Sequence, residues 1–161
     1  MRAVIQRVLS ACVRVDGEVA GSIGRGILLL AGCEKGDTNG DYEWIASKVV
    51  NLRIFPSDLP DGGHFEKSLL DLRAEGFGKE GDAAILAVSQ FTLLGDARKG
   101  RRPSFADAMP VEEAKSAFEN FLGALRETGV PVATGVFQAM MEVESVNHGP
   151  VTIILDSRKR L

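Results

Sequence analysis

The residues Ile27-Leu28-Leu29-Leu30-Ala31 form a continuous apolar run of strand length. A run without alternation is typical of a strand that is buried on both faces, so this segment predicts a central strand of a sheet. The strongly apolar segment from Ala83 to Gln90 predicts a second central strand. Upstream, residues 2–9 alternate as a strand does, and residues 12–20 predict a hairpin that turns at Asp16-Gly17, a strong two-residue turn signal.

Two segments have the apolar periodicity of long helices. The first begins at Thr38-Asn39-Gly40-Asp41, which has the character of a capping box with Asp in place of Glu. The second begins at Pro110, interpreted as its first helical residue, continues through the acidic turn of Glu112-Glu113 and is closed by Gly129. The apolar residues on one face are Tyr42, Ile45, Val49 and Leu52 in the first helix, and Val111, Ala114, Ala117, Phe118, Phe121, Leu122 and Leu125 in the second.

The remaining segments complete a curved α/β architecture. Arg53-Ile54-Phe55 predicts a strand, residues 56–63 predict a surface loop, and residues 95–109 predict a polar, irregular connection. Met141-Glu142-Val143 and Val151 to Leu155 predict a pair of strands on either side of a Gly-Pro turn. With about seven or more strands in runs and two long helices, we expect a three-layer β/β/α arrangement of mixed, strongly curved sheets covered by the two helices.

Length and composition fit one globular domain over residues 1–161, with 45% hydrophobic and 25% charged residues. No apolar run approaches the roughly 20 residues of a membrane span, and the N-terminus has no signal-peptide pattern, so a cytoplasmic protein without a membrane partner is expected. Cys12 and Cys33 lie in apolar, strand-like segments and are interpreted as buried thiols. Two histidines and two cysteines without close ligand spacing indicate no metal site, and no cofactor is expected.

The charge distribution bears on nucleic-acid binding. A net charge of −3 excludes a uniformly basic nucleic-acid binder. The positive charges are nevertheless clustered, with four within residues 98–102 and three within residues 158–160. Local charge is what a phosphate backbone senses, so the glycine-containing segment at 98–105 suits phosphate contacts. A solvated surface fits the same pattern equally well.

The stretch Asn147-His148-Gly149-Pro150-Val151-Thr152 places a proline where a strand should begin. Proline has no backbone N–H, so Pro150 is predicted at the first residue of a strand or in a tight turn. A cis peptide bond is affordable here, because the trans preference of an X-Pro bond is only about 0.5–1 kcal/mol. A cis bond would aim two carbonyl oxygens in one direction, where they can grip an ammonium group. The local sequence alone favours the other interpretation, an ordinary turn before a strand.

Side chains that could form a hydrolytic triad do not assemble in the sequence. His64 lies in a glycine-rich loop, and His148 has no acidic residue nearby to orient it. Thr92 and Thr152 are β-branched residues in predicted strands, where a structural role is the default. Each is also a candidate for hydrogen bonding to a substrate, and we count Thr152 among the substrate-binding residues.

Three motifs together resemble the D-aminoacyl-tRNA deacylases. They are Ser89-Gln90-Phe91-Thr92-Leu93, the basic segment from Arg98 to Phe105, and Gly149-Pro150-Val151-Thr152. Each motif alone is weak, but their order over 161 residues is specific. The match covers the chain end to end, because similar residues also occur at Ile5-Gln6-Arg7-Val8, Asp16-Gly17-Glu18-Val19, Arg53-Ile54-Phe55 and Gly135-Val136-Phe137.

The resemblance implies a homodimeric enzyme that hydrolyses the ester between a D-amino acid, or glycine, and the 3′-terminal adenosine of tRNA. It implies that a cis Gly149-Pro150 pair enters the partner subunit's pocket and faces the α-amino group of the substrate. An L-amino acid would then clash with main-chain carbonyls. It also implies that the Ser89–Thr92 segment supplies an oxyanion hole from the backbone N–H groups around Gln90, Phe91 and Thr92, while the ribose 2′-OH assists the attack.

Further residues acquire expected roles from the same resemblance. Arg7 would hold the Gly-Pro loop, and Phe137 and Met141 would lie near the adenosine. The sequence departs from the usual family pattern at Gln138, where a small residue is usual, and at His148, where Asp is common. The expected contacts to tRNA phosphates are Lys99, Arg101 and Arg102.

Three alternatives remain open on sequence alone. One is an RNA- or tRNA-binding module without catalysis, favoured by the basic segment and the missing triad. Another is an esterase that uses the Thr92 hydroxyl. The third is a relative that acts on L-alanyl-tRNA through a trans Gly149-Pro150 bond, since the sequence does not reveal the isomer.

Overall fold

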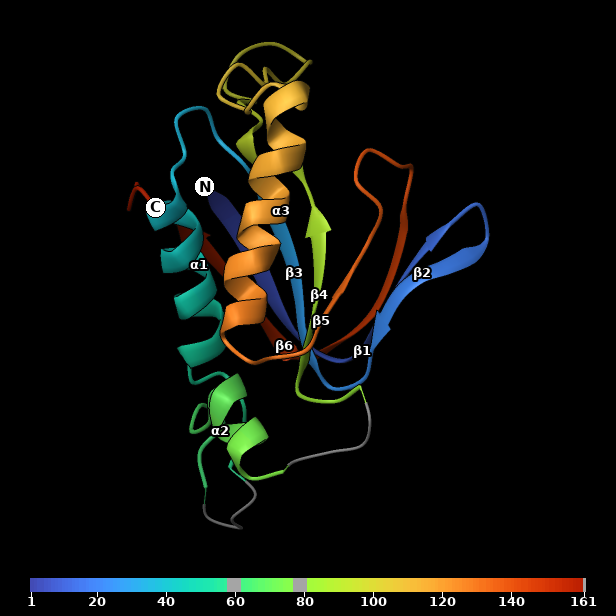
Figure 1. The fold of residues 1–161 in the computed structure, drawn as a ribbon, viewed down its shortest axis with the longest axis vertical. Helices are drawn as coiled ribbons and strands as arrows, with labels where there is room; N and C mark the ends of the chain where they lie inside the picture. Colours follow the sequence, from blue (N-terminus) through green and yellow to red (C-terminus); the bar gives the residue numbers. More distant parts are fainter. Residues whose placement is uncertain (58–61, 77–80, 161) are drawn as a thin grey trace.

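The computed structural model describes residues 1–57, 62–76 and 81–160, and it contains one mixed sheet covered by helices (Figure 1). Strand order among these residues is β2-β1-β3-β4-β5, and β6 pairs with the free part of β1. The strands are β1 (Arg2–Val15), β2 (Glu18–Ile23), β3 (Gly26–Gly32), β4 (Ala84–Ser89), β5 (Val132–Thr134) and β6 (Glu142–Asp156). The helices are α1 (Asn39–Asn51), α2 (Leu69–Ala74), α3 (Val111–Glu127) and the 3₁₀ turn η1 (Phe91–Leu94).

The sheet curls until its edges approach each other. A Cβ placed on Gly21 of β2 would lie only 2.4 Å from the Thr134 carbonyl oxygen of β5, so no other residue fits between these strands. Pairing is antiparallel between β1 and β3 but parallel from β3 through β4 to β5. The predicted α/β class with a mixed, strongly curved sheet is therefore confirmed, although one continuous sheet supplies both β layers.

The apolar runs of the central strands serve two separate cores. Ile27 and Leu29 of β3 pack with residues of α1 and α3 in the larger core, whereas Leu28 packs with Leu86 of β4 inside the curl of the sheet. Figure 1 shows α1 and α3 side by side over one face of the sheet. Burial on both faces explains why β3 and β4 lack polar alternation, and their predicted central position is confirmed.

Local signals fixed the helix starts with one shift. The predicted capping box of α1 forms, with the Thr38 N–H donating to Asp41 Oδ2 at 2.9 Å. Pro110 is the N-cap of α3 rather than its first helical residue, because its ψ of 145° is extended while its carbonyl accepts the Ala114 N–H. The short helix α2, which begins with a capping box of Ser68 and Asp71, was not predicted.

Several strand predictions were wrong. Six strands occur in the described residues, rather than about seven or more. Residues 53–55 form no strand, because only Phe55 bridges to Lys67 before Pro56, which has no N–H, ends the pairing. Of the loop predicted at 56–63, residues 58–61 lie outside the part of the chain described here.

The predicted pair of strands around Pro150 is a single long strand, β6, which begins after Met141. Both of its halves pair with the 14-residue strand β1. Gln6 pairs with Thr152 and Val8 with Asn147, so residues 148–151 bulge opposite a single residue. Pro150 therefore occupies a bulge, which tolerates the missing N–H as well as a strand start or a turn does.

Candidate active site

A cavity of about 640 Å³ opens where the three parallel strands end. The carboxyl ends of β3 and β4 contribute Ala31–Cys33 and Val88–Thr92, and the segment after β5 contributes Phe137–Met141. Carboxyl ends of parallel strands meet at one edge of a sheet, which is a common position for ligand sites. The remaining walls come from Met109, from Val111, Ala114 and Phe118 of α3, and from Val143 of β6.

The η1 turn presents two backbone donors at this cavity. The Gln90 N–H donates to the Ala31 carbonyl at 2.8 Å and is therefore occupied. The Phe91 and Thr92 N–H groups begin the turn, where no intrahelical acceptor exists, and within the described residues they donate to no acceptor. The donor set expected from the family is thus reduced from three amides to two in this chain.

The cavity wall carries almost no ionisable chemistry. Its hydroxyl groups belong to Ser89 and to Thr92, whose Oγ1 accepts a hydrogen bond from Gln90 Nε2. Cys33 is the one titratable residue among those lining the cavity; burial, with a smaller effect of Asp37, raises its pKa to about 12. The neutral thiol is a poor nucleophile. Cys12, which was expected to be buried, is half-buried on β1 and lies outside the cavity wall.

Arg7 organises the bulge that contains the Gly-Pro pair. Its guanidinium is 4% exposed, and Nε donates to the His148 carbonyl at 3.0 Å. Nη1 donates to the carbonyls of Ile54 at 2.5 Å and His64 at 3.2 Å. Burial lowers the Arg7 pKa, and Arg25 lowers it further. The Gly149-Pro150 peptide bond is cis.

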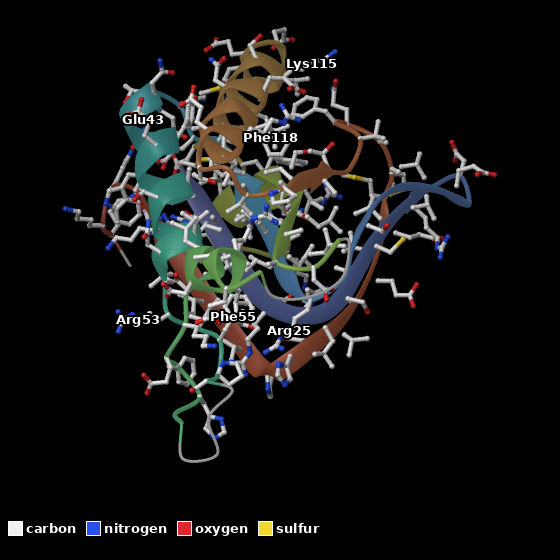
Figure 2. All side chains as sticks on the ribbon, turned by 60° about the horizontal axis from the view of Figure 1, so that its bottom comes forward. Arg25, Glu43, Arg53, Phe55, Lys115 and Phe118 are labelled. Carbon is white, nitrogen blue, oxygen red and sulfur yellow. The ribbon has the colours of Figure 1, made fainter. Side chains whose placement is uncertain are left out.

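The two groups of predicted site residues occupy different places. Ser89, Gln90, Phe91, Thr92, Phe137 and Met141 line the cavity. Gly149 and Pro150 are exposed at the bulge beside Arg7, and none of these three lines the cavity. Figure 2 shows the separation between Phe118 of the cavity wall and Arg25, which lies near Arg7.

Other polar groups at the bulge also lie outside the cavity. Thr152 Oγ1 accepts from Gln6 Nε2 and Asn147 Nδ2, both at 3.3 Å. The two histidines contribute their carbonyls to Arg7, and neither lines the cavity. A histidine-dependent triad at the cavity is therefore not formed in the part of the chain described.

The basic segment lies next to η1. Phe105 packs edge-on against Phe91 with ring centroids 5.0 Å apart, and this contact ties the segment to the cavity wall. Arg98 pairs with Asp96 at 2.7 Å. Lys99, Arg101 and Arg102 are exposed, and none forms an ion pair with another described residue.

The second predicted cation cluster is used inside the fold. Arg158 and Arg160 both pair with Glu34, at 3.3 and 2.5 Å. These arginines therefore have acidic partners in the chain itself, which the spacing of charges along the sequence did not reveal.

Sequence reasoning missed part of the cavity wall. Phe118 was assigned to the core, and it does pack there, but it also lines the cavity. Met109 and Met140 were not singled out, because flexible apolar residues in irregular segments carry no periodic signal. Met140 is 91% exposed, which is unusual for a large apolar side chain.

Two functional classes can be addressed directly. None of the described helices is both long and apolar enough to cross a membrane. The described residues also contain no group of three or more His, Cys, Asp or Glu side chains arranged to hold a metal ion.

Comparison with known proteins identifies the family. The family model described as D-Tyr-tRNA(Tyr) deacylase matches residues 4–156. The D-aminoacyl-tRNA deacylase of Geobacter sulfurreducens is 52% identical over 160 residues, covering 99% of this chain and 97% of the relative. The D-aminoacyl-tRNA deacylase of Dehalococcoides mccartyi strain CBDB1 is 53% identical over 161 residues, covering 100% and 97%.

Solved structures agree with this assignment. A structure titled "c-Myc DNA Unwinding Element Binding Protein" superimposes with a TM-score of 0.84 at 41% identity, covering 97% of this chain and 98% of that one. A probable eukaryotic D-amino acid tRNA deacylase, at 16% identity and a TM-score of 0.73 over 96% and 97% of the chains, shares the fold. This chain belongs to the D-aminoacyl-tRNA deacylase family, whose members are hydrolases of the aminoacyl-tRNA ester bond.

Proposed function

We propose that this protein removes D-amino acids, and glycine, from the 3′-terminal adenosine of tRNA, with the amides of Phe91 and Thr92 as its oxyanion hole. The observation that carries the proposal is the combination of two unoccupied backbone donors with a cavity wall whose only titratable side chain is a neutral thiol. Such a site polarises an ester carbonyl without a protein nucleophile. Each donor of this kind is worth on the order of 10²–10³ in rate.

The reaction then needs only water and the substrate's own groups. Water attacks the ester carbonyl carbon, and the oxygen of that carbonyl becomes an anion that the two amides stabilise. The bond to the ribose 3′-oxygen breaks, and this oxygen takes the proton that water releases. The neighbouring ribose 2′-OH assists the attack, held in place by binding rather than by a protein base. The products are the free amino acid and tRNA with its 3′-OH restored.

The apolar end of the cavity suits the adenine base. Phe137 and Met141 line this region, and Phe118 stands against Phe137 with ring centroids 6.2 Å apart. Aromatic rings and thioethers contact a nucleobase face favourably and need no charge to do so. The base would therefore be held mainly by stacking and the ester placed beside η1.

A second copy of the chain completes the site in this proposal. Gly149 and Pro150 are exposed and lie outside their own chain's cavity, so they serve as the chiral selector only when inserted into a partner's cavity. The paired strands β1 and β6 also expose large apolar side chains, at Leu9, Val146 and Ile154. A homodimer would cover such residues. Main-chain carbonyls of the selector would exclude every L-side chain, independent of its identity.

Lys99, Arg101 and Arg102 are the proposed contacts to tRNA phosphates. They are exposed, and the ring contact between Phe105 and Phe91 places their segment beside the cavity. Because phosphate contacts release counterions, replacing all three by Gln should reduce the slope of log affinity against log salt by about 2 to 3. The proposed place of action is the cytoplasm, where tRNA is used.

The decisive experiment compares matched D-tyrosyl- and L-tyrosyl-tRNA as substrates, with Pro150→Ala run beside the wild type. Release of only D-tyrosine, lost in the variant, supports chiral editing. Hydrolysis of both esters, or of neither, contradicts it. L-alanyl-tRNA belongs in the same series, because its cleavage would favour the alternative editing activity.

Two controls separate the rival functions. Thr92→Val tests the hydroxyl mechanism: loss of turnover with tRNA binding retained would favour a threonine-dependent esterase over backbone donors. Gly149→Ala tests a pure binding role, which would leave tRNA affinity as the sole activity and respond little. One structural relative has a DNA-binding title, so duplex DNA is included as a competitor; DNA that displaces tRNA without any ester hydrolysis would support binding alone.

A further inference from the structure

The η1 turn is held at its far end by a charged side chain from the first strand. Arg2 of β1 donates from Nη1 to the Leu93 carbonyl at 2.7 Å. The first anchor of the turn is the hydrogen bond from the Gln90 N–H to the Ala31 carbonyl. Between these two anchors lie the Phe91 and Thr92 amides, and no side chain caps the turn itself.

Arg2 is fixed by a buried carboxylate. It pairs in register with Asp156 of β6, and its Nη2 lies 3.6 Å from Asp156 Oδ2. Asp156 is 4% exposed. Burial acts to raise its pKa, but the Arg158 N–H, the Arg160 side chain and the charge of Arg2 together keep it lowered. The carboxylate therefore stays ionised at neutral pH and opposes the Arg2 charge.

Arg160 extends the network to the other wall of the cavity. It contacts Asp156 Oδ2 at 3.0 Å and grips both carboxylate oxygens of Glu34, at 2.8 and 2.5 Å. Glu34 is 3% exposed and directly follows Cys33, a residue of the cavity wall. The Cys33 carbonyl in turn accepts the Met109 N–H at 3.0 Å, so a third lining residue is tied to the same place.

We propose that Arg2 is a positioning residue for ester hydrolysis, which sets the direction of the Phe91 and Thr92 amides by fixing the Leu93 carbonyl. This inference rests on the function proposed above. Asp156 and Arg160 hold Arg2 in place, and none of these three residues lines the cavity. Small displacements matter here because hydrogen-bond donors stabilise an oxyanion only when aimed at its final position, and a shift of about 1 Å can lower a rate 10²-fold.

The test compares Arg2→Met, Arg2→Lys and Asp156→Asn with Arg14→Met, a control at the far end of the same strand. Single-turnover hydrolysis of D-tyrosyl-tRNA and the Kd for uncharged tRNA are measured at a temperature where each variant is folded. We expect Arg2→Met to lose about 10-fold or more in rate with Kd changed less than twofold, because one misdirected donor is worth at least that much. Arg2→Lys should recover part of the rate, Asp156→Asn should resemble Arg2→Met, and Arg14→Met should match the wild type.

A second readout does not depend on activity. The backbone amide resonances of Phe91 and Thr92 should shift in Arg2→Met and return toward their wild-type positions in Arg2→Lys. Unchanged resonances, or a rate loss that only follows thermal stability, would overturn the positioning role. If the wild type hydrolyses no D-ester, the proposed function fails, and the resonances still decide whether Arg2 orders the turn.

Discussion

Replacing Gly149 by alanine adds one methyl group at the most crowded point of the bulge. Gly149 has a φ of +126°, a conformation that residues with a side chain rarely adopt. The new Cβ would lie 2.8 Å from Arg7 Nη2 and 2.8 Å from Val151 Cγ2. An arginine side chain can usually move aside, but this one is buried and bound to the carbonyls of residues 54, 64 and 148.

The loss of stability follows from two contributions. Forcing a non-glycine residue into this region costs about 1–3 kcal/mol. Displacing Arg7 breaks at least one hydrogen bond from a charged donor, worth about 1.5–3 kcal/mol. Together, the free energy of unfolding should fall by about 2.5–6 kcal/mol, which corresponds to a Tm lower by roughly 5–20 °C for a domain of this size.

Gly17→Ala is the matched control for Gly149→Ala. Gly17 also has a positive φ, +83°, but no heavy atom lies within 4 Å of its built Cβ. It should lose only the conformational part, about 1–3 kcal/mol. Urea denaturation measures both variants, and deacylation of D-tyrosyl-tRNA is followed at a temperature where both are folded. Equal stability losses would refute the clash with Arg7, and full deacylation by Gly149→Ala would refute the selector role of the bulge.

Three other predictions test the cavity and its support. A Cβ on Gly32 would lie 2.7 Å from the Gln90 carbonyl oxygen, so Gly32→Ala should shift η1 and lower single-turnover deacylation at least 10-fold; an unchanged rate would show that η1 position is not critical. Gly123→Ala in α3 meets no atom within 4 Å and should raise the free energy of unfolding by about 0.5–1 kcal/mol, with a decrease in urea denaturation counting against the helix geometry. Cys33→Ala should keep deacylation. Since the Cys33 pKa is raised from 9.0 to about 12, the thiol's contribution to stability is complete below pH 9 and is lost as pH rises toward 12, and Cys33→Ala should lack this part of the pH dependence of unfolding.

The central strands and long helices could be predicted because their signals are local. The apolar runs of β3 and β4 indicate burial on both faces, which the two cores provide. The capping box at Thr38 and the acidic turn after Pro110 marked helix starts to within one residue. In each case the interaction that fixes the element joins residues close together in sequence.

The bulge around Pro150 could not be predicted in the same way. A proline between two apolar segments predicts a break, and two strands joined by a turn satisfy that prediction. The actual solution depends on β1, which is long enough to pair with both halves of β6. It also depends on Arg7, whose buried guanidinium fills the space beside the bulge. Both conditions are properties of distant residues, which one segment cannot reveal.

The candidate site was found by resemblance, and the structure explains why local chemistry was a weaker guide. Reactive side chains normally mark an active site, but the donors proposed here are backbone amides, which every residue except proline carries. What distinguishes the amides of Phe91 and Thr92 is their place, at the start of a turn that follows a buried parallel strand. Polar residues directly after such a strand were the one local signal, present at Ser89 and Gln90.

The placement of charge supports the same interpretation of the chemistry. Glu34 and Asp156 are buried with their arginine partners behind the cavity walls, whereas the wall itself carries only neutral groups. A carboxylate inside the cavity would repel a developing oxyanion and reverse the benefit of the two amides. Charges that are paired one layer away can still fix the position of those amides, because hydrogen bonds through Arg2 transmit position without adding a net negative charge to the cavity. On this argument, the wall must be neutral for the backbone donors to act, and the rigidity that they need is supplied from outside it.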